Sequence, residues 1–181
     1  MIRNFIHIKD NFLLDEECDQ VIDFFNKLPE KTFYKEGNYE GVLLTDAEES
    51  NYLKDNKLSF LKNRFQIALN EYIELYPELN FVEPFYLTEI RFKHWKKNNF
   101  FDRWHSEHNS ETPLRILNFM IYLSTHNCGT QFLDKRIIKS EKGRLVIFPS
   151  YFTHTHRGMP CPDKKDRYMV GGYFNFKKSE D

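Results

Sequence analysis

The chain has 181 residues, of which 40% are apolar and 29% are charged, and its formal net charge is −1. This length fits one domain with a sizeable core, and the composition is typical of a globular protein rather than a disordered one. The balanced charge and the short, interrupted basic clusters argue against nucleic-acid binding. We therefore expect a single domain over residues 1–181 without a nucleic-acid partner.

The three cysteines, Cys18, Cys128 and Cys161, lack the regular spacing of a disulfide framework and the close pairs of a zinc site. They indicate a reduced, cytosolic setting. The N-terminus lacks the long apolar stretch of a secretory signal, and no apolar run is long enough to cross a bilayer. The sequence thus predicts a cytoplasmic protein without membrane contact.

The first part of the chain, about residues 1–80, predicts one strand followed by two helices. The run FIHIKDNFL has the alternating, aromatic character of a strand. A helix follows from about Leu14, with Asp15 as its cap and acidic residues in its first turn, and Pro29 ends it. Its apolar face consists of Val21, Ile22, Phe24 and Phe25.

Between the two predicted helices, residues 31–51 are polar and irregular, with a short hairpin expected in TFYKEGNYEGVLL. The second helix is expected over residues 52–75. Its apolar residues recur at helical spacing, and we expect them to pack in the core rather than to bind a cofactor. They are Leu58, Leu61, Phe65, Ala68, Leu69 and Tyr72.

After Pro77 the pattern changes to short β-rich runs that turn signals separate. These runs are FYLTEIRFKHW, LRILNFMIYLS, TQFLD, RLVIFPS and RYMVGGYFNF. Several short strands at close spacing are typical of a sandwich or barrel. The sequence therefore predicts an α+β protein in which helices support a β core, a barrel or jelly roll, over about residues 81–176. We place the chemistry on this core.

The stretch FFDRWHSEHN places His105 and Glu107 two residues apart. In an extended backbone such residues project to the same face, so an imidazole and a carboxylate would reach one point, as in a metal site or an acid–base pair. Roughly one His-x-acid triplet is expected by chance in a chain of this composition. On its own, the pattern favours a surface pair over a ligand pair.

Two further histidines, His154 and His156, share a strand face by the same alternation. One of them would complete a set of two histidines and one carboxylate, which leaves coordination positions open and is typical of non-haem Fe(II) oxygenases rather than of structural zinc. His156 is the better candidate, because Gly158 and Pro160 begin a turn that places it at the mouth of the barrel. His154 then lines the pocket, supports a ligand or packs in the core.

Arg167 begins a run whose two faces are both apolar, as in a strand buried on both sides. Met169 and Tyr173 lie on one face, and Tyr168, Val170 and Phe174 lie on the other. Arginine is rarely buried without a partner, and its planar fork fits a carboxylate. On its own, the pattern favours a protein carboxylate as that partner over the carboxylate of a small acid.

Together, the ordered blocks HSE, LNFMIYLS, GTQFLD, RLVIFPS, HRGMP and RYMVGGY resemble the 2-oxoglutarate- and Fe(II)-dependent oxygenases. The chain is most similar to their prolyl-4-hydroxylase-like group, including small versions typical of phages and bacteria. The resemblance covers about residues 88–176, and IHIKDNFLLDEECDQVIDFF resembles the lead-in of that group. It implies a double-stranded β-helix, a cupin-like jelly roll, with the N-terminal helices packed on one sheet.

The resemblance also implies a metal centre. His105, Glu107 and His156 match the ligands of Fe(II), with Glu107 where the commonest form of the motif has Asp. Relatives that carry Gly or Ala in place of this carboxylate can be halogenases, so Glu107 argues against that activity. The implied cofactors are Fe(II), 2-oxoglutarate and O2.

The resemblance places four more residues at the cosubstrate pocket of the family. Arg167 matches the basic residue that holds the distal carboxylate of 2-oxoglutarate, where many relatives have Lys. Trp95 stands where relatives often have a tyrosine, and Tyr122 and Thr130 fall in strand blocks that flank the pocket. The implied reaction hydroxylates a C–H bond of a prolyl residue in a peptide, or of a small molecule, and releases succinate and CO2, in a bacterial cell or phage-infected host.

Two other functions stay open, and so do the substrate contacts. A zinc-dependent hydrolase would use His105, His108 and a distal histidine as ligands. A non-catalytic cupin-like module would bind a small acid at Arg167 without turnover. Residues 31–51 and 98–104 are candidate covers of the pocket mouth, where Phe100, Phe101 and Trp104 either contact substrate or pack. The oligomeric state is not indicated.

Overall fold

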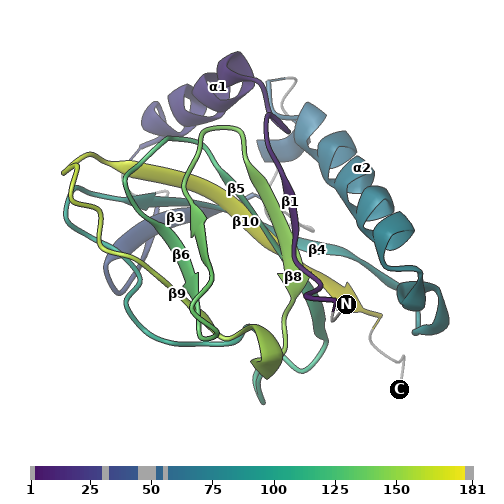
Figure 1. Ribbon diagram of the computed structural model, residues 1–181. Helices are drawn as coiled ribbons and strands as arrows, with labels where there is room; N and C mark the ends of the chain where they lie inside the picture. The colour runs from purple at the N-terminus through teal and green to yellow at the C-terminus, as the bar shows by residue number, and fades with distance from the viewer. Residues whose placement is uncertain (1–2, 30–32, 45–51, 55–56, 178–181) are drawn as a thin grey trace.

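The computed structural model describes residues 3–29, 33–44, 52–54 and 57–177. Two antiparallel sheets lie face to face, and two helices cover the outer face of the larger sheet (Figure 1). This is the α+β double-stranded β-helix, or jelly roll, that the sequence predicts. No helix in the described part of the chain is long and apolar enough to span a membrane.

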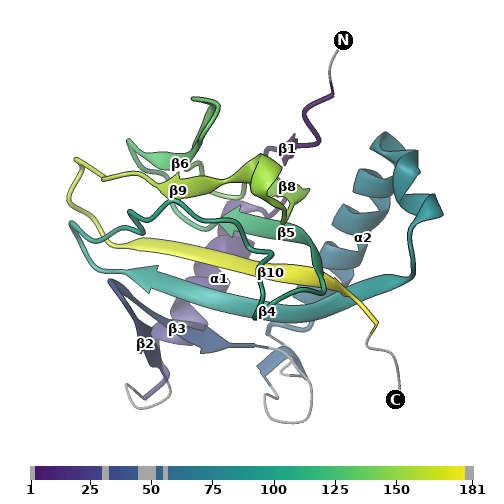
Figure 2. The same ribbon diagram turned by 90° about the horizontal axis from the view of Figure 1, so that it is seen from below.

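The larger sheet has the strand order β1-β8-β5-β10-β4-β3-β2, and the smaller one the order β7-β6-β9. The strands are β1 (His7–Lys9), β2 (Tyr34–Glu36), β3 (Tyr39–Leu43), β4 (Phe85–Trp95), β5 (Arg115–Tyr122), β6 (Gly129–Phe132), β7 (Ile137–Lys139), β8 (Leu145–Pro149), β9 (His156–Gly158) and β10 (Arg167–Phe176). Figure 2 shows the smaller sheet lying on one side of β5 and β10.

Strand alternation divides the buried residues of the large sheet between two cores. On β5, Leu117, Phe119 and Ile121 pack toward the helices, in the larger core. Met120 and Tyr122 point the other way and pack with residues of the smaller sheet. The face that looks at the smaller sheet is therefore the inner wall of the β-helix, and polar groups on it are held away from bulk water.

The first helix, α1 (Asp15–Asn26), buries Cys18, Val21 and Phe25 against the large sheet. The ring of Phe25 stacks on that of Phe92 in β4, with 3.8 Å between centroids. The prediction that Asp15 caps this helix is wrong. The N-cap is Leu14, and its backbone N–H donates to the Glu17 carboxylate at 2.8 Å, because the first-turn acid reaches back.

The second helix, α2 (Phe60–Leu75), buries most of the predicted apolar face, namely Leu61, Phe65, Ala68, Leu69 and Tyr72. The helix begins later than residue 52. Tyr52–Lys54 form a short 3-10 helix instead, and residues 55–56 lie outside the described part of the chain. Residues 57–59 form a turn, so Leu58 is buried just before the helix rather than within it. Two further 3-10 helices cover Pro77–Phe81 and Phe152–His154.

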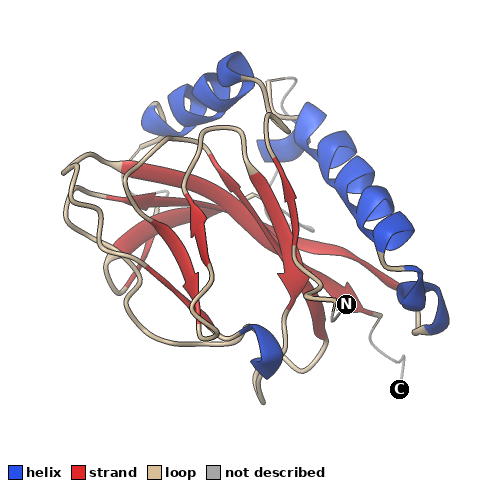
Figure 3. Ribbon diagram, in the orientation of Figure 1, coloured by secondary structure: helices blue, strands red, loops and turns tan. Residues whose placement is uncertain are grey.

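All five predicted β-rich runs form strands, and the predicted hairpin is β2 and β3 (Figure 3). The sequence did not predict β7, and it placed a strand at His154 and His156 where the structure has β9 only from His156 to Gly158. Each has only three residues, which is too short for a clear alternation. Residues 45–51, part of a predicted cover of the pocket, lie outside the described residues.

The prediction about the cysteines is wrong. Cys128 and Cys161 form a disulfide with 5.0 Å between their Cα atoms, while Cys18 is free and buried. Cys128 directly precedes β6 and Cys161 follows β9, and these strands pair antiparallel, so the start of one meets the end of the other. The two cysteines are 33 residues apart in the sequence, and their spacing alone does not show that they are close in the fold. The cysteines therefore no longer support a reducing compartment.

Candidate active site

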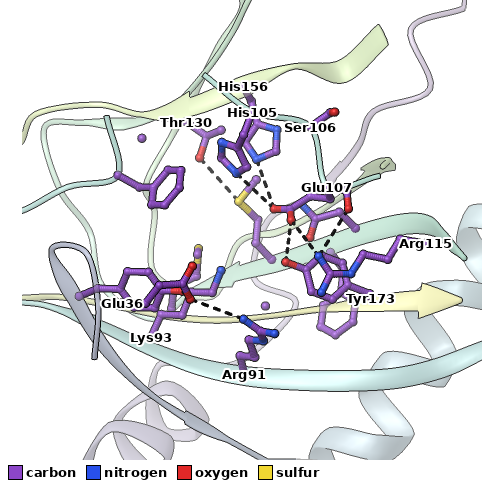
Figure 4. Close-up of a pocket in the computed structure, with 18 of the residues that line it drawn as sticks. Glu36, Arg91, Lys93, His105, Ser106, Glu107, Arg115, Thr130, His156 and Tyr173 are labelled. Carbon is purple, nitrogen blue, oxygen red and sulfur yellow. Dashed lines mark hydrogen bonds and ion pairs between the residues drawn. The ribbon is translucent and has the colours of Figure 1, made fainter. Parts of the chain in front are cut away.

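A cavity of about 450 Å³ lies between the two sheets, and all seven predicted site residues line it. Figure 4 labels four of them, His105, Glu107, Thr130 and His156. Its floor is the inner face of β4, β10 and β5. The register places their side chains in rows across the floor, of which one contains Lys93, Met169 and Tyr122. The next row contains Arg91, Gly171 and Met120, and the absent side chain of Gly171 leaves room at its centre.

His105, Glu107 and His156 converge at the roof of this cavity. The backbones of the two histidines pair, with N–H to O distances of 3.0 and 2.9 Å. Glu107 Oε1 lies 3.3 Å from His105 Nε2 and 3.8 Å from His156 Nε2. Three donor atoms from two distant segments thus lie within 4.8 Å of one another.

Backbone carbonyls fix the tautomers of both histidines. His105 Nδ1 donates to the carbonyl of Arg103, and His156 Nδ1 to that of His154, each at 3.0 Å. A carbonyl only accepts, so each Nδ1 carries the proton and each Nε2 presents its lone pair. Burial lowers the pKa of His156 to about 4 and keeps this ring neutral. Metal-binding histidines are commonly oriented in this way.

The second oxygen of Glu107 is held by the chain itself. Oε2 accepts a hydrogen bond from the Tyr173 hydroxyl at 2.8 Å and lies 3.4 Å from Arg115 Nη1. Burial alone would raise the pKa of Glu107, but the positive charge of Lys93 and the other groups around the carboxylate outweigh it, so the pKa is lowered. Glu107 is therefore an ionised carboxylate whose Oε1 is left facing the two imidazoles.

The backbone conformation that brings these residues together differs from the predicted strands. His105 forms only an isolated bridge, and the chain then bends, with the N–H of Glu107 donating to the carbonyl of Ser150 at 3.0 Å. His154 and His156 do not share a strand face, because His154 ends a 3-10 helix.

Two other histidines lie outside the cluster. The ring of His154 is held by the carbonyl of Asn4, 2.9 Å from Nε2, and only its backbone supports the site. The ring of His108 donates to the carbonyl of Arg115 at 3.2 Å and packs against Tyr151. The ligand set that a zinc hydrolase would take, with His108 as a member, is therefore not assembled.

Arg167, at the start of β10, lies at the other end of the cavity and is 6% exposed. Among the described residues no carboxylate oxygen comes within 4.0 Å of its guanidinium. Nη1 donates to the carbonyl of Met159 at 3.3 Å and lies 3.2 and 3.3 Å from the sulfurs of Cys128 and Cys161. The head packs 4.9 Å from the Trp95 ring, and burial lowers the pKa of Arg167. The expected protein carboxylate is thus missing from the described part of the chain.

Three polar groups accompany this arginine in the cavity. The Tyr122 hydroxyl donates to Thr130 Oγ1 at 2.7 Å, and burial raises the pKa of Tyr122 to about 12. Trp95 Nε1 is buried without a hydrogen-bond partner among the described residues. A buried N–H without an acceptor is costly, so this end has both a cation and a donor that suit an anionic ligand.

The sequence reasoning missed Tyr173, Arg115 and Lys93. Tyr173 was read only as part of an apolar strand face, although its position on the same face as Arg167 was the available signal. Of the candidate substrate contacts, Phe101 lines the cavity, with its ring 4.5 Å from that of His105. Trp104 is 40% exposed and packs under Arg157.

The donor set fits ferrous iron. Two neutral imidazole nitrogens and one carboxylate oxygen, all on one side of a cavity, match the facial ligation of non-haem Fe(II). The structure brings the seven predicted residues into one pocket, and their individual roles stay predictions.

Comparison with known proteins agrees with this geometry. Residues 90–175 match the 2OG-Fe(II) oxygenase superfamily. No match is found among curated protein sequences. The collagen prolyl hydroxylase of Paramecium bursaria Chlorella virus-1, in complex with 2-oxoglutarate, has a TM-score of 0.69 at 17% identity, covering 96% of this chain and 97% of that one.

Two bacterial structures are also similar. A Pseudomonas putida prolyl-4-hydroxylase has a TM-score of 0.66 at 16% identity, covering 96% of this chain and 93% of that one. HygX of Streptomyces hygroscopicus, with nickel and 2-oxoglutarate bound, has a TM-score of 0.63 at 9% identity, covering 95% and 83%. At these identities the likeness concerns the fold. With the family match across the β core and the His-x-Glu…His cluster within it, the chain is an enzyme of the 2OG-Fe(II) oxygenase superfamily and uses Fe(II) and 2-oxoglutarate.

Proposed function

We propose that His105, Glu107 and His156 bind Fe(II) and that Arg167 anchors 2-oxoglutarate, so that the enzyme hydroxylates a C–H bond. The observation that carries this proposal is the convergence of Nε2, Nε2 and Oε1 with both Nδ1 atoms already engaged by carbonyls. All three donors approach from one side, which leaves the cavity side open for cosubstrate and O2.

The chain's own groups would position the cosubstrate. Arg167 presents a buried, uncompensated fork to a carboxylate, with the Trp95 N–H and the hydroxyls of Tyr122 and Thr130 nearby. When bound, Fe(II), 2-oxoglutarate and O2 supply the oxidising power that hydroxylates the substrate, with release of succinate and CO2. Tyr173 and Arg115 hold Glu107 in place meanwhile.

We further infer that the chain works as one catalytic domain. The helices α1 and α2 and the outer face of the large sheet share one core, so the helices brace the floor on which Arg167 sits. The substrate is either a prolyl residue in a peptide or a small molecule. The likeness to the viral and bacterial prolyl hydroxylases supports the former, and the cavity volume, which is typical of small-molecule sites, supports the latter.

Anaerobic addition of Fe(II) and 2-oxoglutarate tests the metal and cosubstrate sites without any substrate. We expect a weak visible charge-transfer band at saturation, and its absence from the wild-type enzyme would refute the assignment. Aerobic succinate formation with prolyl peptides and amino acids then tests hydroxylation. Tightly held zinc together with no succinate release would instead favour the hydrolase.

A further inference from the structure

The inner face of β4 carries two basic residues at the cavity floor. Alternation along this strand sends Ile90 and Phe92 into the core under the helices, and Arg91, Lys93 and Trp95 into the cavity. Figure 4 shows Arg91 and Lys93 on the side of the cavity opposite the two histidines. This floor therefore adds positive charge beyond that of Arg167.

Protein carboxylates compensate two of the cavity's cations. Arg91 forms an ion pair with Glu89 and lies 3.8 Å from Glu36. Arg115 lies 3.4 Å from Glu107 and 3.7 Å from Glu89. These two arginines are thus paired within the protein, and neither requires an anionic ligand.

Lys93 differs, because within the described residues no carboxylate oxygen lies within 4.0 Å of its ammonium. Its nearest recorded partner is the ring of Tyr39, 5.5 Å away. Burial lowers the pKa of Lys93, and the carboxylates of Glu107, Glu36 and Glu89 oppose that shift from beyond ion-pair distance. Glu36 and Glu89 are engaged by arginines, and once Glu107 binds a metal ion its charge is shared with that ion, so Lys93 has no carboxylate of its own among the described residues.

Among the described residues that line the cavity, two cations, Arg167 and Lys93, have no carboxylate oxygen within 4.0 Å, and they occupy different rows of the floor. Arg167 pairs with Trp95 in the register, and Met169 pairs with Lys93, which places Lys93 about 7 Å farther along the strands. One dicarboxylate that extends from Arg167 to the metal triad accounts for only the first cation. A second anionic group is needed beside Lys93.

We propose that the substrate is a small carboxylic acid whose carboxylate binds Lys93. This inference rests on the proposed function, since it takes the first anion to be 2-oxoglutarate. The cavity volume of about 450 Å³ is in the range of small-molecule sites. Glu36 and Tyr39, from β2 and β3, line the same cavity, so the hairpin forms part of its wall at this end. A cationic subsite inside such a cavity suits a small acid better than the neutral backbone of a peptide.

The test titrates small acids into the anaerobic enzyme loaded with Fe(II) and 2-oxoglutarate, following the charge-transfer band. The probes are L-proline, L-leucine and L-glutamate, each beside its α-carboxamide, and a prolyl peptide with both ends blocked. We expect at least one acid to bind and its carboxamide to bind at least about tenfold more weakly.

Variants locate the effect at one side chain. Lys93→Met should weaken binding of that acid by about tenfold or more while changing the affinity for 2-oxoglutarate less than about twofold, and Lys93→Arg should retain most of the binding. Lys96→Met, an exposed lysine just beyond the same strand, is the matched control and should bind the acid as the wild type does.

The outcomes separate this inference from the proposed function. If the band forms but no acid binds, or the carboxamide or blocked peptide binds equally well, the assignment of Lys93 is wrong while the metal and cosubstrate sites stand. If Lys93→Met weakens 2-oxoglutarate instead of the acid, Lys93 serves the cosubstrate and the inference also fails. Absence of the band would refute the proposed function itself.

Discussion

The two ends of the cavity differ in how their buried charged groups are paired. At the triad every polar atom except the three converging donors has a partner in the protein, down to the Tyr173 hydroxyl on Glu107. At the other end Arg167 is buried with no carboxylate within 4.0 Å among the described residues. The first end is built to hold its shape alone, and the second is completed only by an anion from outside.

The largest effect is expected from a substitution at the triad. Glu107→Ala removes its only carboxylate, and we expect succinate formation to fall by at least about 1,000-fold, since loss of a supporting partner alone costs about 10- to 100-fold. Steady-state succinate release, with total iron measured on the same samples, checks this. Asp134→Ala removes an exposed carboxylate paired with Arg136 and serves as the control. Substantial turnover by Glu107→Ala would show that the metal is bound elsewhere.

At the other end, Arg167→Met should leave the metal site intact and weaken 2-oxoglutarate by about 100-fold, because two charge-assisted hydrogen bonds are lost. Titration of the charge-transfer band measures this affinity, and binding of Co(II) without 2-oxoglutarate measures the metal site separately. The thermal midpoint should not fall, since an unpaired buried charge is exchanged for an apolar chain of similar reach. An unchanged affinity for 2-oxoglutarate would contradict the role of Arg167.

The strands that form the site were easier to predict from the sequence than the contacts between its residues. The strands around the site were predictable because β4 and β10 are long β-rich runs bounded by turn signals, and the predicted ends match the observed bounds. The convergence of His105 with His156 was predictable only through resemblance to a family. The three-residue β9 that positions His156 shows no period, and partners 51 residues apart leave no local signal.

Groups that depend on three-dimensional pairing were not predictable. The approach of Cys128 to Cys161 follows from the pairing of β6 with β9. The function of Tyr173 follows from its distance to Glu107, and the apolar residues around it made it look like simple packing. Whether Lys93 is paired depends on where Glu89 and Glu36 point, which composition and spacing do not determine.

Tyr173→Phe removes one hydrogen-bond partner of Glu107 at the triad, where the polar atoms are paired within the protein. Glu107 Oε2 would lose its hydrogen bond of 2.8 Å and the carboxylate would rotate more freely, so we expect Co(II) or Fe(II) affinity to fall by about 10-fold. Calorimetric titration of the metal checks this. Tyr168→Phe, on the opposite face of β10, is the matched control. Equal metal affinity in both variants would show that Arg115 alone orients Glu107.

The smallest effect on the site is expected from the disulfide beside Arg167. Cys128→Ser removes a cross-link between residues that are 33 apart in the sequence. The chain entropy that such a cross-link removes from the unfolded state corresponds to a stabilisation of about 3–4 kcal/mol. The thermal midpoint should therefore fall by about 10 °C. The affinity for 2-oxoglutarate should fall only a few-fold, because Met159 and Trp95 still hold the guanidinium. Thermal unfolding with and without dithiothreitol checks this, since the reductant should lower the wild-type midpoint and leave that of Cys128→Ser unchanged. A loss of affinity as large as that of Arg167→Met would mean that the disulfide, rather than the strand, fixes the position of the arginine.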